Sequence, residues 1–238
     1  MDQFQMTPQS AFAAAGAVSA ERVTAFLRKV YGWMCVGLAL TAIVALTVAG
    51  SPALTQAVFG NKILFYGLIL GELGLVFFLS ARVQKLSAST AAALFLLYSA
   101  LNGATLAFIF LAYTGTSIAT TFIVTAGMFG ALALYGSVTQ RSLAGVGQFA
   151  FMGLVGLVLA SLVGMFWHSQ GLQFGISVVG VIVFTGLTAW DAQRLKAMAA
   201  AVPEGQAGSY AVVGALSLYL DFINLFLFLL RLFGGRRD

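Results

Sequence analysis

FTGLTAWDAQRLKAMAAAVPEGQAGSYAVVGALSLYLDFINLFLFLLR, residues 184–231, is the stretch that decides the fold class. It holds the end of one long apolar run and the whole of the next, joined by a polar segment around Pro203. Asp191 lies near the end of the first run, and Asp221 lies inside the second. Because a carboxylate at the centre of a membrane helix costs about 2.5 to 3.5 kcal/mol on insertion scales, both acids are candidates for function.

The composition of the whole chain is that of a polytopic membrane protein. Hydrophobic residues make up 61% of the 238 residues and charged residues 8%, and the mean hydropathy is +0.99, which excludes an ordinary water-soluble domain. The net charge is +5, but the basic residues stand singly or in pairs at the ends of apolar runs. That pattern favours contact with lipid headgroups over nucleic acid. One cysteine, Cys35, and one histidine, His168, argue against a disulfide framework, a histidine zinc site or a resident cofactor.

Seven apolar runs follow a polar start, and each is close to the ~20 residues that cross a ~30 Å hydrocarbon core as a helix. Backbone groups must be satisfied internally in lipid, so the sequence predicts an all-α membrane protein with seven transmembrane helices. We expect a cytoplasmic tail over 1–29, a transmembrane domain over 30–231 and a short basic tail over 232–238. The seven predicted spans are 30–50, 62–81, 90–112, 117–138, 146–167, 172–193 and 211–230.

Lysine and arginine positions predict the orientation. With a cytoplasmic N-terminus, the loops facing outward hold only Lys62 before the last run, a positive-inside distribution. The tail residues Arg231, Arg236 and Arg237 break this rule if the last run crosses completely. We expect a full crossing, because residues 211–230 are long enough; a re-entrant last run is the alternative. The cations on the cytoplasmic side are Arg22, Arg28, Lys29, Arg82, Lys85, Arg141, Arg194 and Lys196.

Three of the seven acidic residues lie in or at the edge of apolar runs: Glu72, Asp191 and Asp221. If the two aspartates face each other from consecutive antiparallel helices, they share one proton and titrate as a pair. Deprotonated, they offer the hard oxygens that calcium binds, although calcium prefers six to eight oxygens and two carboxylates supply part of that shell. The alternative is that each acid is protonated and hydrogen-bonded across helices. Further polar groups that could line such a site are Asn102, Ser217, Tyr219 and Asn224.

The 27 glycines have a packing interpretation. Small residues four apart let helix backbones approach closely in lipid. Gly67 with Gly71, Gly171 with Gly175, and Gly156 with Gly164 through Ala160 have this spacing, so we expect them at helix–helix contacts.

Two segments also carry a family resemblance: TGLTAWDAQRL at 185–195 and LSLYLDFINLFLFLLRLF at 216–233. They resemble the two closing helices of the Bax inhibitor (transmembrane Bax inhibitor motif, TMBIM) family, whose bacterial members have seven helices and a short basic tail. The resemblance covers residues 20–235, and YLDFINLF is its most specific run. A weaker match is RxxxxLRKVYxWMxxGL at 22–38. Trp190 stands where the family often has tyrosine, while the acid that follows it is kept.

The resemblance implies a pH-sensitive calcium leak in the bacterial cytoplasmic (inner) membrane, with the last helix central and wrapped by the other six. The family's aspartate pair, which senses pH and gates the path, corresponds to Asp191 and Asp221. Its latching arginine on the second helix corresponds to Arg82, and its ion-path glutamate to Glu72. Calcium and protons are then the partners, together with lipid, and the chain is not an enzyme.

Other functions remain open at this point. A non-conducting regulator of a membrane protease or stress response, acting on a membrane protein partner, fits the resemblance too. A proton-coupled secondary transporter also fits intramembrane acids, although no inverted repeat is visible. A diaspartyl protease would need Gly-x-Gly-Asp, whereas Leu218, Tyr219 and Leu220 precede Asp221. A rhomboid protease would need a histidine inside the membrane, and His168 follows Trp167 at a predicted loop.

Overall fold

The computed structural model describes residues 8–167 and 169–237, and it contains seven helices long and apolar enough to cross a membrane. This confirms the all-α, seven-span prediction for the described part of the chain. The helices and the two short 3-10 helices are α1 (Pro8–Ala49), α2 (Pro52–Phe59), α3 (Lys62–Arg82), η1 (Val83–Lys85), α4 (Ala88–Leu106), α5 (Phe108–Ala112), α6 (Gly115–Val138), α7 (Ala144–Phe166), α8 (Gln170–Ala201), η2 (Glu204–Gln206) and α9 (Ala207–Phe233).

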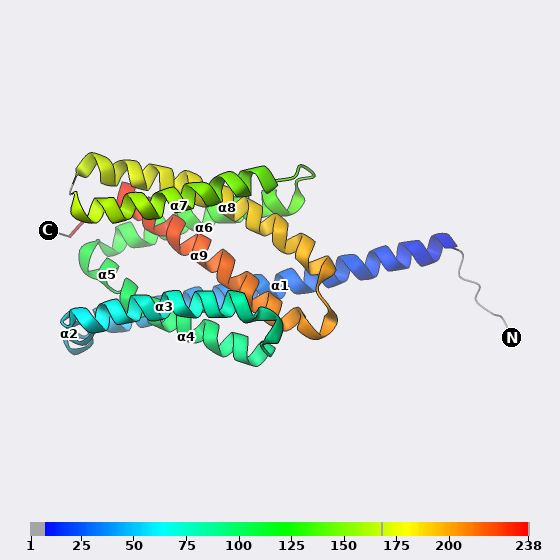
Figure 1. Ribbon diagram of the computed structural model, residues 1–238, viewed down its shortest axis with the longest axis horizontal. Helices are drawn as coiled ribbons and strands as arrows, with labels where there is room; N and C mark the ends of the chain where they lie inside the picture. Colours follow the sequence, from blue (N-terminus) through cyan, green and yellow to red (C-terminus); the bar gives the residue numbers. More distant parts are fainter. Residues whose placement is uncertain (1–7, 168, 238) are drawn as a thin grey trace.

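The spans run alternately up and down between two ends of the bundle (Figure 1). The N-terminal end, on the right in that view, is where α1 enters and where the connections η1, 139–143 and η2 lie. The C-terminal end, on the left, holds α2, α5, the end of α7, the start of α8 and the end of α9. Because α9 is 27 residues long and ends opposite the start of α1, the last run is a full crossing and not re-entrant.

Helix ends follow local sequence signals. Asn61, Ser87, Thr114 and Ser169 are N-caps whose side chains accept hydrogen bonds from the first backbone N–H groups of α3, α4, α6 and α8. Such caps satisfy donors that have no partner within the helix. They lie between apolar runs, which is why the seven predicted spans agree in position with the observed helices.

The first helix begins earlier than the first predicted span. Residues 8–29 are helical and continuous with the span Ala20–Ala49, and the start of α1 projects beyond the bundle in Figure 1. At 1.5 Å per residue a helix of 42 residues is about 63 Å long, roughly twice the hydrocarbon thickness. The assignment of residues 1–29 to the cytoplasm stays a prediction, and His168 lies outside the described residues.

The last helix is the most buried span. In α9, 61% of the most apolar 18-residue window is buried, against 11% in α3. Helix α9 packs mainly against α8, α1, α4 and α6, and lightly against α3. Its side chains Leu216, Leu218, Tyr219 and Leu225 are almost fully enclosed. A movement of α9 would therefore disturb most of the bundle.

Close backbone contacts form at glycines other than those expected from spacing. A side chain at Gly136 of α6 would overlap the carbonyl of Ala189 in α8, and one at Gly103 of α4 would meet the carbonyl oxygen of Thr41 in α1 at 2.6 Å. By contrast, a side chain at Gly67, Gly71, Gly156 or Gly175 would find open space, and at Gly171 only a neighbouring serine at 3.8 Å. The spacing-based prediction was wrong for these five and holds only at Gly164, which touches α8.

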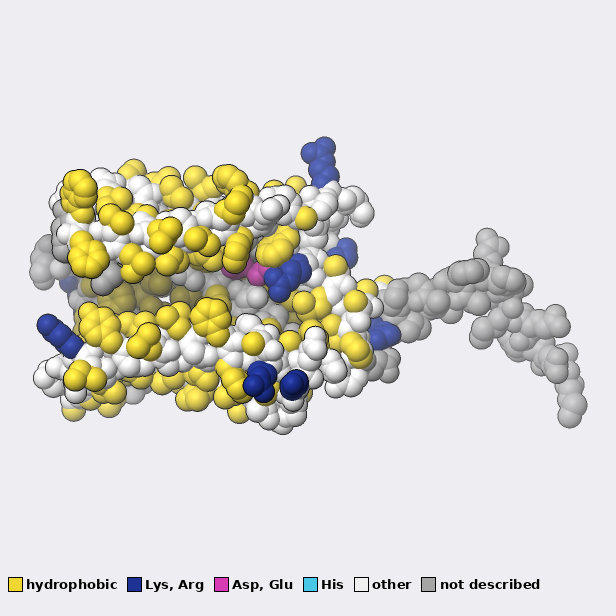
Figure 2. Space-filling view, viewed as in Figure 1, with side chains coloured by type: hydrophobic (Ala, Val, Ile, Leu, Met, Phe, Trp, Pro, Cys, Tyr) yellow, Lys and Arg dark blue, Asp and Glu magenta, His cyan; other side chains and the backbone are white. Residues whose placement is uncertain are grey.

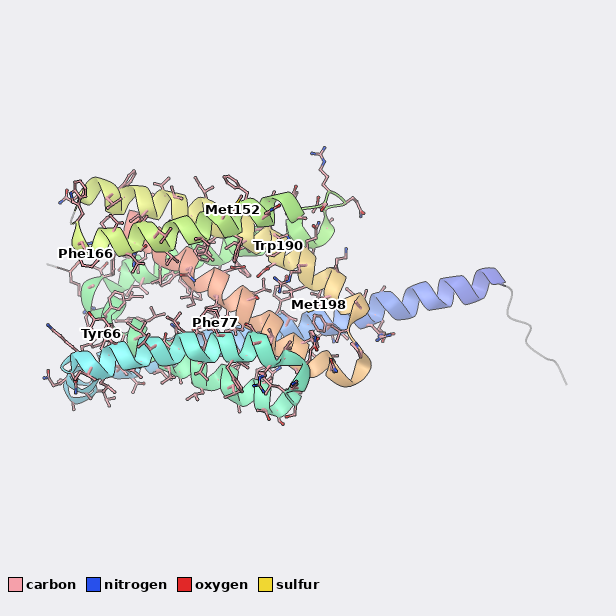
Figure 3. The ribbon with its side chains drawn as sticks, viewed as in Figure 1. Tyr66, Phe77, Met152, Phe166, Trp190 and Met198 are labelled. Atoms are coloured by element: carbon pink, nitrogen blue, oxygen red, sulfur yellow. The ribbon has the colours of Figure 1, made fainter. Side chains whose placement is uncertain are left out.

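The outer surface of the bundle is apolar. Tyr66 and Phe77 on α3, and Met152 and Phe166 on α7, are labelled in Figure 3 and point their side chains away from the helix axes. Phe77 is 73% exposed and Phe166 88% exposed. Exposed patches of this extent mark contact with lipid or protein. Together with seven apolar spans, they make the chain a multi-pass membrane protein embedded in the bilayer.

Candidate functional site

The aspartate pair is formed where the last two helices cross. Helix α8 carries Asp191 on its second half, and the short connection 202–206 returns the chain so that α9 packs on α8 over its length. Asp221 is the fifteenth residue of the 27 in α9. The two side chains are buried, with relative exposures of 8% and 5%, and their carboxylates are close enough to repel each other electrostatically. Both acids are thus buried at the α8–α9 contact, and their role as a functional pair stays a prediction.

The two carboxylates have unequal partners. Arg194 Nη1 donates to Asp191 Oδ1 at 3.4 Å, three residues further along α8, and Ser217 of α9 also adjoins Asp191. The guanidinium of Arg194 lies 5.2 Å from the centre of the Trp190 ring. In the described part of the chain, Asp221 Oδ2 is the buried side-chain oxygen or nitrogen without a hydrogen-bond partner. The pair therefore combines one acid that contacts an arginine with one acid that has an unpartnered oxygen.

The arginine predicted as the latch, Arg82, is not the arginine that contacts Asp191 in the structure. Arg82 ends α3, and its guanidinium lies 6.0 Å from the centre of the Phe78 ring. The arginine in contact with Asp191 is Arg194. Sequence reasoning listed Arg194 only as a cytoplasmic cation, although its spacing of three residues from Asp191 is a visible signal for a shared helix face.

Glu72 lies in a separate hydrogen-bonded network that sequence reasoning missed. Asn102 Nδ2 donates to Glu72 Oε2 at 3.1 Å and Thr105 Oγ1 donates to Oε1 at 2.9 Å. Tyr219 OH donates to Asn102 Oδ1 at 2.9 Å and lies 2.6 Å from Thr41 Oγ1. These five residues, here called the Glu72 network, join α3, α4, α9 and α1. Both oxygens of Glu72 are occupied, as expected for an acid that hydrogen-bonds across helices.

The geometry of α9 explains why the two polar groups stay apart. Tyr219 and Asp221 are two residues apart, so at 100° per residue they point to nearly opposite faces of the helix. Tyr219 faces α1 and α4 through the Glu72 network, and Asp221 faces Asp191 of α8. Asn102 and Tyr219 therefore do not line the aspartate pair. Ser217 adjoins Asp191, and Asn224, whose amide donates to Leu220 O at 2.8 Å, lines a cavity with residues of α7 and α8.

The described residues contain no group of three or more histidine, cysteine, aspartate or glutamate side chains that could hold a metal ion. Asp191 and Asp221 alone offer four carboxylate oxygens, and Arg194 already donates to one of them. Calcium takes six to eight oxygens. The pair therefore supplies only part of the oxygen shell that a resident calcium ion takes.

A hollow leads toward buried polar groups from one side of the bundle. Figure 2 shows it between the apolar surfaces of α3 and α7, with acidic atoms and a Lys/Arg side chain beside each other along its edge. In the same view of Figure 1, α9 runs obliquely between α3 and α7. Trp190 and Met198 of α8 are labelled on this side in Figure 3. Charged groups are thus reachable from this face, although the surrounding surface is apolar.

Comparison with known proteins identifies the family. Residues 23–238 match the family described as "Inhibitor of apoptosis-promoting Bax1", the Bax inhibitor family. The chain belongs to this family. It is 50% identical over 215 residues to the inner membrane protein YbhL of Escherichia coli K12, covering 89% of this chain and 92% of the relative.

Other bacterial relatives extend the match. An uncharacterized protein of Borreliella burgdorferi is 46% identical over 90% of this chain and 93% of its own length. An uncharacterized membrane protein of Streptococcus pyogenes serotype M1 is 40% identical over 90% of this chain and 93% of its own length. The resemblance noted in the two closing helices thus extends over most of this Bax inhibitor family chain.

Proposed function

We propose that this Bax inhibitor family protein is a calcium leak of the bacterial inner membrane, gated by pH through Asp191 and Asp221. The observation that carries the proposal is the pair itself: two buried carboxylates on consecutive helices repel each other, and one oxygen of Asp221 has no partner. Such an arrangement changes its energy with each proton gained or lost. Asp221 lies on α9, the most buried span, so a change in its protonation alters how favourably α9 packs in the bundle.

The gating step follows from the contacts of the pair. With one shared proton, repulsion is small and α9 stays packed on α8 beside the Arg194–Asp191 ion pair. Loss of that proton creates two like charges in a poorly solvated place, and separation of α9 from α8 relieves the repulsion. Calcium would then pass along the opened α8–α9 contact. Arg82 as a latch and Glu72 as an ion-path acid stay predictions beside this step.

The orientation is part of the proposal. Eight of the lysines and arginines lie toward the N-terminal end of the bundle, in α1, η1 with the end of α3, the 139–143 connection and the second half of α8. The positive-inside rule puts that end in the cytoplasm. The inner membrane location is supported by the name of the relative YbhL.

The test is calcium flux into proteoliposomes that contain a calcium dye, measured at several pH values. We expect the native chain to show flux that follows pH, and Asp191→Asn/Asp221→Asn to show a flat profile. Glu21→Gln is the matched control, because it makes the same acid-to-amide change at an exposed position on α1. The double variant keeping the native pH profile would refute the sensor role.

The same assay separates the alternatives. Saturable uptake that depends on a co-substrate would identify a proton-coupled transporter. Absence of flux at every pH, in a chain whose loss still has a cellular phenotype, would identify a non-conducting regulator. No step of bond breakage is proposed for the pair, so we propose no enzymatic activity.

A further inference from the structure

Three arginines gather at the C-terminal end of the bundle, opposite the eight cations of the N-terminal end. Arg231 is in the last turn of α9, and Arg236 and Arg237 follow the helix. Among the described residues, no carboxylate forms an ion pair with any of them. Three exposed cations therefore stand at the end that the positive-inside rule leaves poor in lysine and arginine, where they can attract an anionic partner.

The backbone around these arginines is fixed. Thr114 N donates to Gly235 O at 3.1 Å, and Arg237 N donates to Ala112 O at 3.0 Å. Gly235 N donates to Ser117 Oγ at 2.9 Å. The segment after α9 is thus held against the α5–α6 corner, so Arg236 and Arg237 start from defined positions.

The three arginines line one large cavity of about 1030 Å³. Its other polar side chains come from the start of α8, where Ser169, Gln170, Gln173 and Ser177 supply hydroxyl and amide groups. We call this space the arginine cavity. Three guanidinium groups with neighbouring hydrogen-bond donors are a chemical match for the oxygens of a phosphate ester.

A second cavity of about 500 Å³ lies between α7, α8 and α9 and shares Gln173 and Arg231 with the first. We call it the apolar slot, because six of its other lining residues are aliphatic or aromatic, although Ser161 and Asn224 also line it. Arg231 stands at the boundary, with its guanidinium 5.7 Å from the centre of the Phe228 ring. The apolar lining is Leu154, Leu157, Val158, Leu162, Phe184 and Phe228.

We propose that the two cavities together bind one anionic phospholipid, with its phosphate on the arginines and an acyl chain in the apolar slot. A basic polar cavity that shares Gln173 and Arg231 with a neighbouring, more apolar cavity in a membrane-spanning bundle matches an amphipathic anion. A soluble phosphate would use the arginines and leave the slot without a role. The binding site does not depend on the proposed calcium leak.

The test measures lipid binding to the purified full chain by native mass spectrometry. Phosphatidylglycerol is the anionic lipid, and phosphatidylcholine, which has no net charge, is the control lipid. Arg231→Gln/Arg236→Gln/Arg237→Gln should weaken phosphatidylglycerol binding by about tenfold or more, since charge-assisted hydrogen bonds are the strong ones. The matched control removes three cations away from the cavities: Lys62→Gln/Lys85→Gln/Arg141→Gln. We expect it to bind phosphatidylglycerol as the native chain does. Should the triple arginine variant not fold, Arg237→Gln alone gives a smaller loss of the same sign.

A second variant tests the slot and separates a lipid from a soluble anion. Ser161→Phe places a ring in the slot, and should weaken phosphatidylglycerol binding while leaving binding of water-soluble glycerol phosphate unchanged. Equal binding of phosphatidylglycerol and phosphatidylcholine would overturn the proposal, and so would equal losses in the arginine and control variants. Glycerol phosphate binding as tightly as the lipid, with no effect of Ser161→Phe, would show a soluble-anion site instead.

Discussion

Replacing an acid by its amide should have opposite effects on stability at the two buried acidic sites. Asp221→Asn removes a carboxylate that is repelled by Asp191 and has one oxygen without a partner. Glu72→Gln removes a carboxylate whose two oxygens accept hydrogen bonds from Asn102 and Thr105. The volume of the side chain is nearly unchanged in both cases, so the hydrogen bonds and charges decide the sign.

The magnitudes follow from these contacts. A buried polar group without a partner costs about 1 to 3 kcal/mol, and we expect Asp221→Asn to recover part of this, about 1 to 2 kcal/mol. In Glu72→Gln the new amide nitrogen can donate to Thr105 Oγ1, whose hydroxyl then donates to Asn102 O, so hydrogen bonds to a carboxylate become weaker neutral ones at a cost of about 1 kcal/mol. Functional sites often trade stability in this way.

The assay is thermal unfolding of the purified chain in one detergent at neutral pH, with both variants beside the native chain. For a chain of this size, 1 kcal/mol changes the midpoint by about 2 to 4 °C. We expect a rise of about 2 to 8 °C for Asp221→Asn and a fall for Glu72→Gln. A fall for Asp221→Asn as well would refute the interpretation, because it would show that the unpaired oxygen contributes to stability.

Two other paired substitutions test the scaffold. Tyr219→Phe should lower the free energy of unfolding by about 1 kcal/mol, because it breaks the Glu72 network; Tyr98→Phe, whose ring packs on Tyr219, is the control expected to change little in thermal unfolding. Gly136→Ala should cost about 1 to 3 kcal/mol, since a methyl group would overlap the backbone of α8. Gly156→Ala faces open space and should be neutral or slightly stabilising, so equal effects of the two alanines would contradict the packing.

Sequence reasoning identified what depends on length and polarity. A run of about 20 apolar residues must be a helix in lipid, and this alone gave all seven spans. An acid inside such a run is conspicuous for the same reason. Glu72, Asp191 and Asp221 therefore stand out from the printed residues, and the structure confirms that all three are buried, while their functional roles stay predictions.

The contacts that depend on how one helix is rotated against another could not be predicted from the sequence. Gly156 and Gly136 are equally small residues in apolar helices, and only the rotation of the helices shows that the second meets α8 and the first meets open space. The Glu72 network could not be predicted for the same reason, since its members Thr41 and Tyr219 are 178 residues apart in the sequence. Arg194 is different: its position three residues after Asp191 is visible in the sequence, and this spacing predicts that the two side chains share a face of α8.

The two faces of α9 suggest where a gate can open. On the face toward α1 and α4, Tyr219 is held by two hydrogen bonds of 2.6 and 2.9 Å that carry no net charge of their own. On the face toward α8, Asp221 meets another carboxylate and lacks a partner on one oxygen. A change in the proton occupancy of the aspartate pair acts directly on the second face, whereas the ionisable group of the first face is Glu72, which Tyr219 reaches through Asn102. If the pair gates the chain, α9 would therefore separate from α8 while keeping its contact with α1 and α4, and the path would form beside Asp191 and Arg194.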